Sequence, residues 1–198
     1  MEQLKRPVMH VVAALLLGAW FAAALLPAGV AHAQAANPVQ AEEIDELHAR
    51  LADPDEADWR AVERSLVRAW ARSGSASMDL LLLRGRAAMT RGDHVRAVEH
   101  LTALTEMAPE FAEGWNARAT AFYAQEEFGL SMDDIRRTLA LNPRHFGALA
   151  GLGRILEQLG EDQAALRAYR EALRINPHLA PIRDAAEALE AKVGGQAL

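Results

Sequence analysis

Apolar residues recur at helical spacing through the middle of the chain, and the pattern itself repeats every 34 residues. Pro109, Pro143 and Pro177 mark this period. Each proline follows two stretches in which apolar residues return at every third or fourth position, which is typical of amphipathic helices. Because a fixed period of about 20 to 50 residues is the signature of a repeat architecture, the pattern predicts a stack of helical hairpins.

Three units align over residues 78–111, 112–145 and 146–179. In each unit, small residues lie where two helices must approach closely, and a bulky residue follows on the second helix. The small residues are Gly85 and Ala97, Ala119 and Ser131, and Gly153 and Ala165, and the bulky residues are Leu101, Ile135 and Tyr169. Proline suits the first turn of a helix and ends the segment before it, so the three prolines explain the unit boundaries.

This pattern resembles the tetratricopeptide repeat (TPR), a helix–turn–helix unit of about 34 residues. The resemblance implies an all-α fold, a right-handed α-solenoid in which the first helix of each unit lines a concave face. Where the family pattern has leucine, this chain has Arg84 and Arg118. We expect each arginine to form an ion pair within its own unit, Arg84 with Glu99 and Arg118 with Asp133 or Asp134, because a planar guanidinium suits such sites.

Residues 42–77 show a weaker helical pattern and are interpreted as a degenerate first helix pair of the stack. Terminal units of repeat proteins are commonly atypical. We expect the second helix of this pair to begin at Asp53 and Pro54, which combine a capping residue with a first-turn proline. Residues 34–41 are predicted to form a flexible linker before the pair.

Residues 180–193 predict a helix that caps the far end of the stack, which exposed repeat ends require. We expect this helix to end at Gly194, followed by a tail over residues 194–198. Nine helices and no strand are expected in all.

Residues 1–33 have the three-part pattern of a secretory signal peptide: a short basic start, an apolar run and small residues before a cleavage site. The apolar run, residues 11–26, has 16 residues and falls short of the ~20 that a spanning helix needs. We therefore expect cleavage between Ala33 and Gln34, no membrane span in the processed chain, and residence in the bacterial periplasm. The sequence leaves open whether the leader is always cleaved.

Composition argues against several classes of function. The net charge of −6 disfavours nucleic-acid binding, which needs a basic surface, and the absence of cysteine excludes disulfides and thiolate chemistry. The seven histidines do not show the spacing of metal ligands, and the sequence has no phosphate-binding loop or G-x-S-x-G motif. We therefore expect no catalytic residue, no metal site and no cofactor.

The resemblance implies a binding groove on the first helix of each unit. Arg86 and Arg154 hold equivalent places in different units, and Asn116 lies between them, so the three side chains could bind the carboxylate and main chain of a peptide. The alternative is that these arginines are solvated in local i,i+4 pairs. The candidate groove residues are Arg86, Met89, Asn116, Thr120, Tyr123, Arg154 and Glu157.

The leading functional interpretation is a non-enzymatic scaffold that binds a protein or peptide partner, of unknown identity, in the concave groove. The alternative is a structural subunit that forms a homo-oligomer or a larger complex through its end helices or convex face. Trp59 and Trp70 of the degenerate pair could serve that alternative. The third and least favoured hypothesis is an enzyme, or a binder of a small cofactor or a cell-wall glycan.

Overall fold

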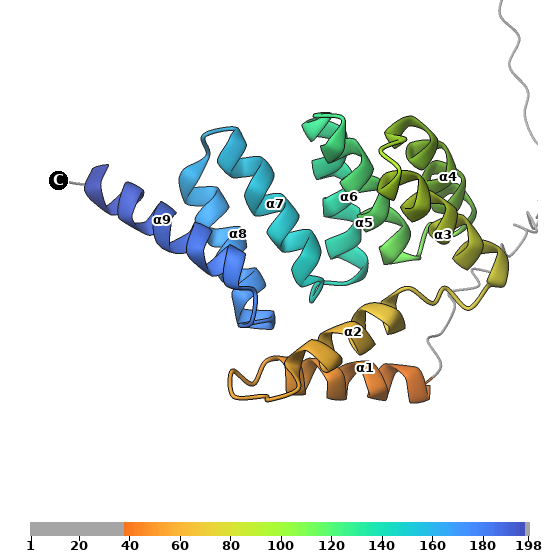
Figure 1. Cartoon of the computed structure of the whole chain (residues 1–198), viewed down its shortest axis with the longest axis horizontal. Coiled ribbons are helices and arrows are strands. Elements are labelled where there is room, and N and C mark those ends of the chain that lie inside the picture. The colour runs from red at the N-terminus through yellow and green to blue at the C-terminus, as the bar shows by residue number, and fades with distance from the viewer. Residues whose placement is uncertain (1–37, 197–198) are drawn as a thin grey trace, which may run out of the picture. The chain divides into compact units, whose positions relative to one another are not determined.

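The computed structural model describes residues 38–196 (Figure 1). The expected signal peptide, with its cleavage site between Ala33 and Gln34, lies outside the described residues. Among residues 38–196, no helix combines the length and the hydropathy needed to cross a membrane.

The described chain is all-helical, as the sequence predicts, with nine α-helices and no strand between residues 38 and 196. The helices are α1 (Pro38–Leu51), α2 (Trp59–Trp70), α3 (Ala76–Thr90), α4 (His94–Met107), α5 (Ala112–Ala124), α6 (Phe128–Leu141), α7 (Phe146–Gln158), α8 (Asp162–Ile175) and α9 (Ala180–Gln196).

Helices α3 to α8 pack as three antiparallel pairs, α3 with α4, α5 with α6 and α7 with α8. The small residues allow this close approach. A Cβ on Gly153 would lie 2.3 Å from the ring of Tyr169, and one on Gly85 would lie 2.5 Å from the Leu101 side chain. Tyr169 and Leu101 are fully buried, so the small and bulky positions of each unit interlock.

Each pair also stacks on the next, and α9 packs on α8. The first buried cluster joins α3, α4 and α5 around Leu82, Leu101 and Leu104. The cluster at the other end joins α7, α8 and α9 through Tyr169, Ile182 and other residues. The helix that was expected to cap the stack therefore covers the apolar side of the last pair.

Three expected boundaries differ from the structure: those of the linker, of the tail and of the second helix. The segment expected to be a flexible linker, residues 34–41, overlaps α1, which begins at Pro38, because proline is well suited to a first helical turn. The expected tail, residues 194–198, overlaps α9, which runs on to Gln196. Glycine weakens a helix by only about 1 kcal/mol, so Gly194 does not force it to end.

Helix α2 begins at Trp59 and not at the Asp53–Pro54 turn, so the expected helix start was wrong. The acidic side chains of this segment bond locally instead. The backbone N–H of Asp55 donates to Asp53 Oδ1, and that of Asp58 donates to Glu56 Oε1. Such bonds from carboxylates to nearby N–H groups favour turns over helix.

The α1–α2 pair does not take the place of a preceding unit in front of α3. Its buried residues Leu51, Val62 and Leu66 pack on Phe146 at the start of α7 and Ile175 at the end of α8. In Figure 1 the two helices run beneath the repeat helices. The pair thus lies against the third unit, although it comes just before the first unit in sequence.

Candidate functional site

Two adjoining hollows lie along the first helices of the three units. The α3–α5 hollow is lined by Arg86, Met89, Thr90, Leu101, Glu113, Asn116, Ala117 and Thr120. The α5–α7 hollow, of about 110 Å³, is lined by Asn116, Ala119, Thr120, Tyr123, Ser131, Ile135, Gly147, Ala148, Gly151, Arg154 and Ile155. Asn116 and Thr120 of α5 belong to both, so the two hollows form one candidate site, the groove.

The α5–α7 hollow exists because α7 turns small residues toward α5. A Cβ on Gly151 would lie 3.7 Å from Ile135 Cδ1, which is an ordinary contact, so Gly151 leaves free space rather than a close approach. Ile135 and Ile155 provide buried apolar surface there, and Ser131 is occupied by its bond to the carbonyl oxygen of Ala119, at 2.8 Å. The hollow is therefore apolar in its depth.

Arg154 is the charged residue of the α5–α7 hollow, and it is exposed. Among the described residues, no ion pair involves its guanidinium. Neighbouring Glu157 accepts a hydrogen bond from the Tyr169 hydroxyl at 2.7 Å. Burial of Tyr169, together with this bond, raises the pKa of that hydroxyl. Arg154 is thus available to an anionic ligand, whereas the Glu157 carboxylate also serves the packing of α7 on α8.

Arg86 is not available in the same way, because it forms an ion pair with Glu113 of the next unit. Glu113 is only 4% exposed and has two further partners. Its Oε1 accepts a bond from the Asn116 amide at 3.2 Å, and its Oε2 lies 2.9 Å from His145 Nε2. Burial raises the pKa of Glu113, but the hydrogen bond with His145 and the Arg86 charge more than offset it and hold the pKa below its usual value.

His145 connects the groove to the α1–α2 pair. Its Nδ1 accepts the backbone N–H of Ala148 and caps α7, so the neutral ring carries its proton on Nε2 and donates it to Glu113. Aromatic rings also pack against His145. Trp70 of α2 stacks on the His145 ring with centroids 4.5 Å apart, and its ring centroid lies 5.3 Å from that of Phe146. The interface of α1–α2 with the third unit therefore borders the buried carboxylate of the groove.

Three further contacts hold the α1–α2 interface. Trp59 stacks on His178 with centroids 4.9 Å apart and nearly parallel rings. Asp45 forms an ion pair with Arg144, and His178 Nε2 bonds the carbonyl oxygen of Asp53 at 3.0 Å. The interface combines the apolar cluster with specific polar and aromatic contacts at both ends.

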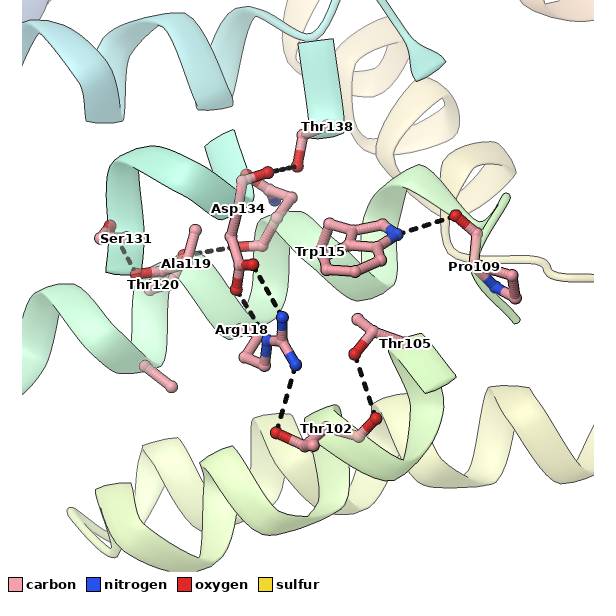
Figure 2. Close-up of polar contacts among 12 residues, drawn as sticks. Thr102, Thr105, Pro109, Trp115, Arg118, Ala119, Thr120, Ser131, Asp134 and Thr138 are labelled. Atoms are coloured by element: carbon pink, nitrogen blue, oxygen red, sulfur yellow. Dashed lines mark hydrogen bonds and ion pairs between the residues drawn. The ribbon is translucent and has the colours of Figure 1, made fainter. Parts of the chain in front are cut away.

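Arg118 fixes the second unit to the first (Figure 2). Its guanidinium binds both carboxylate oxygens of Asp134 on α6, at 2.7 and 2.8 Å, and donates to Thr102 Oγ1 of α4 at 3.3 Å. It also lies over the Trp115 ring, 4.8 Å from the centroid. The expected pairing of Arg118 with the second helix of its unit is confirmed, with Asp134 as the partner.

The expected Arg84–Glu99 pair is wrong: both residues are exposed, and within the described chain no ion pair joins them. The first-unit residue equivalent to Asp134 is His100, one position beyond Glu99, so the carboxylate stands at the equivalent of Asp133 instead. In the second unit Asp133 likewise turns away and pairs with Arg136.

The family model for the tetratricopeptide repeat matches residues 82–134 and 116–180. A TPR repeat-containing protein of Rhizobium etli is 34% identical over 157 residues, which are 78% of this chain and 76% of that protein. The chain belongs to the tetratricopeptide repeat family. Further curated relatives match over only 10% to 29% of their own lengths.

Solved TPR structures share the fold. The first TPR of Spaghetti (RPAP3), bound to an HSP90 peptide, superposes with a TM-score of 0.57 at 18% identity, covering 59% of this chain and 93% of that one. A structure of MamA protein gives 0.56 at 21% identity, covering 77% and 84%. TPR proteins of this kind pack helices pairwise, as α3 to α8 do here.

Six of the seven candidate groove residues line the two hollows of the TPR array. The α3–α5 hollow receives Arg86 and Met89, the α5–α7 hollow receives Tyr123 and Arg154, and both receive Asn116 and Thr120. Glu157 lies outside them. Their role in binding stays a prediction. For Arg86, the alternative that the arginine forms a local i,i+4 pair is wrong, because the carboxylate that it binds, that of Glu113, lies 27 residues away in the sequence.

Sequence reasoning missed the interaction between His145 and Glu113. Glu113 lies at the start of α5 and His145 directly precedes α7, both at places outside the repeat pattern, and His145 appeared in sequence as an isolated histidine. The one available signal is that Glu113 and His145 stand 32 residues apart, close to one period, which brings them to neighbouring helix starts. Among residues 38–196, no group of His, Asp and Glu is arranged to hold a metal ion.

Proposed function

We propose that this TPR chain is a non-enzymatic scaffold that binds a peptide or an extended segment of a protein in its groove. One of its structural neighbours was solved with a peptide bound, and TPR proteins in general act through protein–protein contacts. The proposal applies that mode of binding to the groove shared by α3, α5 and α7.

The α5–α7 hollow is the observation that carries this proposal. Its depth is apolar and has room for a side chain of aliphatic size, and its residues include an amide, a hydroxyl and a free guanidinium. Such a site favours a peptide that inserts an apolar side chain and places a carboxylate near Arg154. Arg86 contributes indirectly, because it neutralises and orients Glu113 beside Asn116.

The proposed compartment is the bacterial periplasm, reached through cleavage of the leader between Ala33 and Gln34. The support is the tripartite pattern of residues 1–33. N-terminal sequencing of the processed protein tests it, with Gln34 expected as the first residue. Recovery of a mature chain that still carries Met1 in the membrane fraction would contradict cleavage.

Selection from a phage-displayed peptide library tests the groove. We expect the selected peptides to bind the Arg154→Glu variant at least about tenfold more weakly, because reversing the charge repels a ligand carboxylate. Tyr123→Ala should also weaken binding, since it removes one wall of the α5–α7 hollow.

Arg167→Glu is the matched control, because Arg167 is an exposed arginine on α8 and lies outside both hollows. Peptides that bind the Arg154→Glu and Tyr123→Ala variants as tightly as the Arg167→Glu variant would remove the groove proposal.

A further inference from the structure

The outward face of α3 is exposed at positions that are covered in the other two units. Leu80 is 44% exposed and Leu83 is 62% exposed. The equivalent residues of α5 and α7 pack on the helix that precedes them, α4 or α6. The equivalent sets are Leu80, Leu83 and Ala87 in α3, Gly114, Ala117 and Ala121 in α5, and Ala148, Gly151 and Ile155 in α7.

This exposure follows from the position of the α1–α2 pair. A preceding unit would cover the outward face of α3, but the helices that come before it in the described chain, α1 and α2, pack on Phe146 and Ile175 of the third unit. The leucines are also bulkier than the glycines and alanines that stand where two units of this chain stack. A covering helix must therefore offer small side chains to Leu80 and Leu83.

The same face carries unpaired positive charge. Arg84 holds the place of Arg118, which in the second unit binds Asp134 and Thr102 (Figure 2). Within the described part of the chain, neither Arg84 nor Arg91, the residue that caps the C-terminal end of α3, has an ion-pair partner. The α3 face is thus apolar at its centre and basic at its side.

The opposite end of the array has the complementary surface. Helix α9 exposes small apolar residues and two carboxylates that are without an ion-pair partner among residues 38–196. Their spacing of three or four residues places them on one side of the helix. The α9 face consists of Ala180, Asp184, Glu187, Ala188 and Ala191.

We propose that the α3 face of one copy docks on the α9 face of a second copy, so that the chains associate head to tail. Leu80 and Leu83 then pack on the exposed alanines, and the two arginines face Asp184 and Glu187. Pairing of two α3 faces is disfavoured, because it would oppose arginine to arginine. In such a pair, one copy still has a free α3 face and the other a free α9 face. Further copies can therefore add at both ends, which builds rings or open chains.

One helix-on-helix contact is smaller than the ~1,000 Å² expected of a stable interface, so the association is concentration-dependent and weakens with salt. The contact between the α3 and α9 faces uses neither hollow of the groove, so its test is independent of the proposed function.

Sedimentation velocity on the purified chain, as the cell processes it, tests this assembly. We expect the average sedimentation coefficient to rise with protein concentration and to fall when salt is added. Leu83→Asp should abolish the rise. Val95→Asp is the matched control, because Val95 is 65% exposed on α4 at a place that is exposed in every unit. A coefficient that does not change with concentration, or an equal loss in both variants, would overturn the proposal.

Charge reversal tests the pairing itself. Arg84→Glu and Glu187→Arg should each weaken association about tenfold, and the double variant should restore it, since the opposite charges face each other again. Failure of the double variant to recover would overturn the proposed contact. Loss of association in Arg154→Glu but not in Leu83→Asp would place the contact in the groove and would likewise overturn it.

Discussion

The repeat helices α3 to α8 and the α1–α2 pair are held in place by different kinds of contact. In the repeats, the same contact recurs in each unit, a small residue such as Gly153 against a bulky one such as Tyr169. The α1–α2 pair is held by contacts that occur once, among them the Trp70–His145 stack and the Asp45–Arg144 ion pair. A recurring contact fixes which helices are neighbours, whereas a helix pair outside the pattern can pack elsewhere, here on the third unit.

Truncating one buried leucine in each region should show the difference between the α1–α2 pair and the repeats most clearly. Leu66 of α2 and Leu101 of α4 are both fully buried, so Leu66→Ala and Leu101→Ala should each cost about 3 kcal/mol. Hydrogen exchange should then rise in α1 and α2 alone for Leu66→Ala, and across α3 to α6 for Leu101→Ala, because the repeats pack on one another.

An equal rise in hydrogen exchange from α1 through α9 in the Leu66→Ala variant would contradict this difference between the two regions. It would mean that the pair is as integral to the array as the repeats are.

A methyl group at the closest helix approach should destabilise the third unit by about 2 kcal/mol. In Gly153→Ala the new Cβ would lie 2.3 Å from the buried Tyr169 ring, so the ring or the helix must move. Thermal unfolding measures the loss. Gly129→Ala on α6 is the control, because no atom beyond its chain neighbours and its own helix backbone lies within 4 Å of its Cβ position, and there alanine should stabilise the helix by up to about 1 kcal/mol. Similar effects at both sites would show that the close approach is not required.

Acidification should release the α1–α2 pair before it affects the repeats. His48 of α1 is 5% exposed and neither ring nitrogen has a hydrogen-bond partner. Burial, assisted by the charge of Arg144, lowers its pKa to about 4, while Asp45 acts in the opposite direction. A released His48 titrates near pH 6.5, so it takes up a proton that the docked form does not bind.

Docking is therefore fully favoured above pH 6.5 and weakens as the pH falls toward 4, by about 1.4 kcal/mol at pH 5.5. The ¹⁹F spectrum of fluorotryptophan at Trp70 reports docking. His48→Phe should abolish the dependence on pH between 6.5 and 5.5, and His100→Ala on α4 should preserve it. Retention of the full dependence in His48→Phe would assign it to another group.

Much of the repeat array could be predicted from sequence, because its determinants lie at fixed spacing. The helix pairs, the close approach at Gly85 and Gly153 and the Arg118–Asp134 pair all follow from aligning the units. The Arg84 prediction failed on a shift of one residue, since His100 stands where a carboxylate was needed. On a helix, one residue turns a side chain by about 100°, enough to remove a contact.

The position of the α1–α2 pair could not be predicted in the same way. Phe146 and Ile175 each belong to a repeat, and nothing in the 34-residue pattern reserves them for a helix more than 70 residues away. The contacts of the buried Glu113 were equally hard to predict, because its partner Arg86 comes from the first unit and its partner His145 is the cap residue of α7. Contacts between distant, non-repeating positions depend on the folded geometry and leave no local periodicity.

Nuclear Overhauser effects from the two tryptophans of α2 test the central claim, that the α1–α2 pair packs on the third unit and leaves α3 uncovered. The structure predicts cross-peaks from the Trp70 indole to the rings of His145 and Phe146, and from Trp59 to His178, whose centroids lie 4.5 to 5.3 Å apart. Cross-peaks from α2 side chains to the methyl groups of Leu80 and Leu83 would instead place the pair in front of α3 and contradict the account.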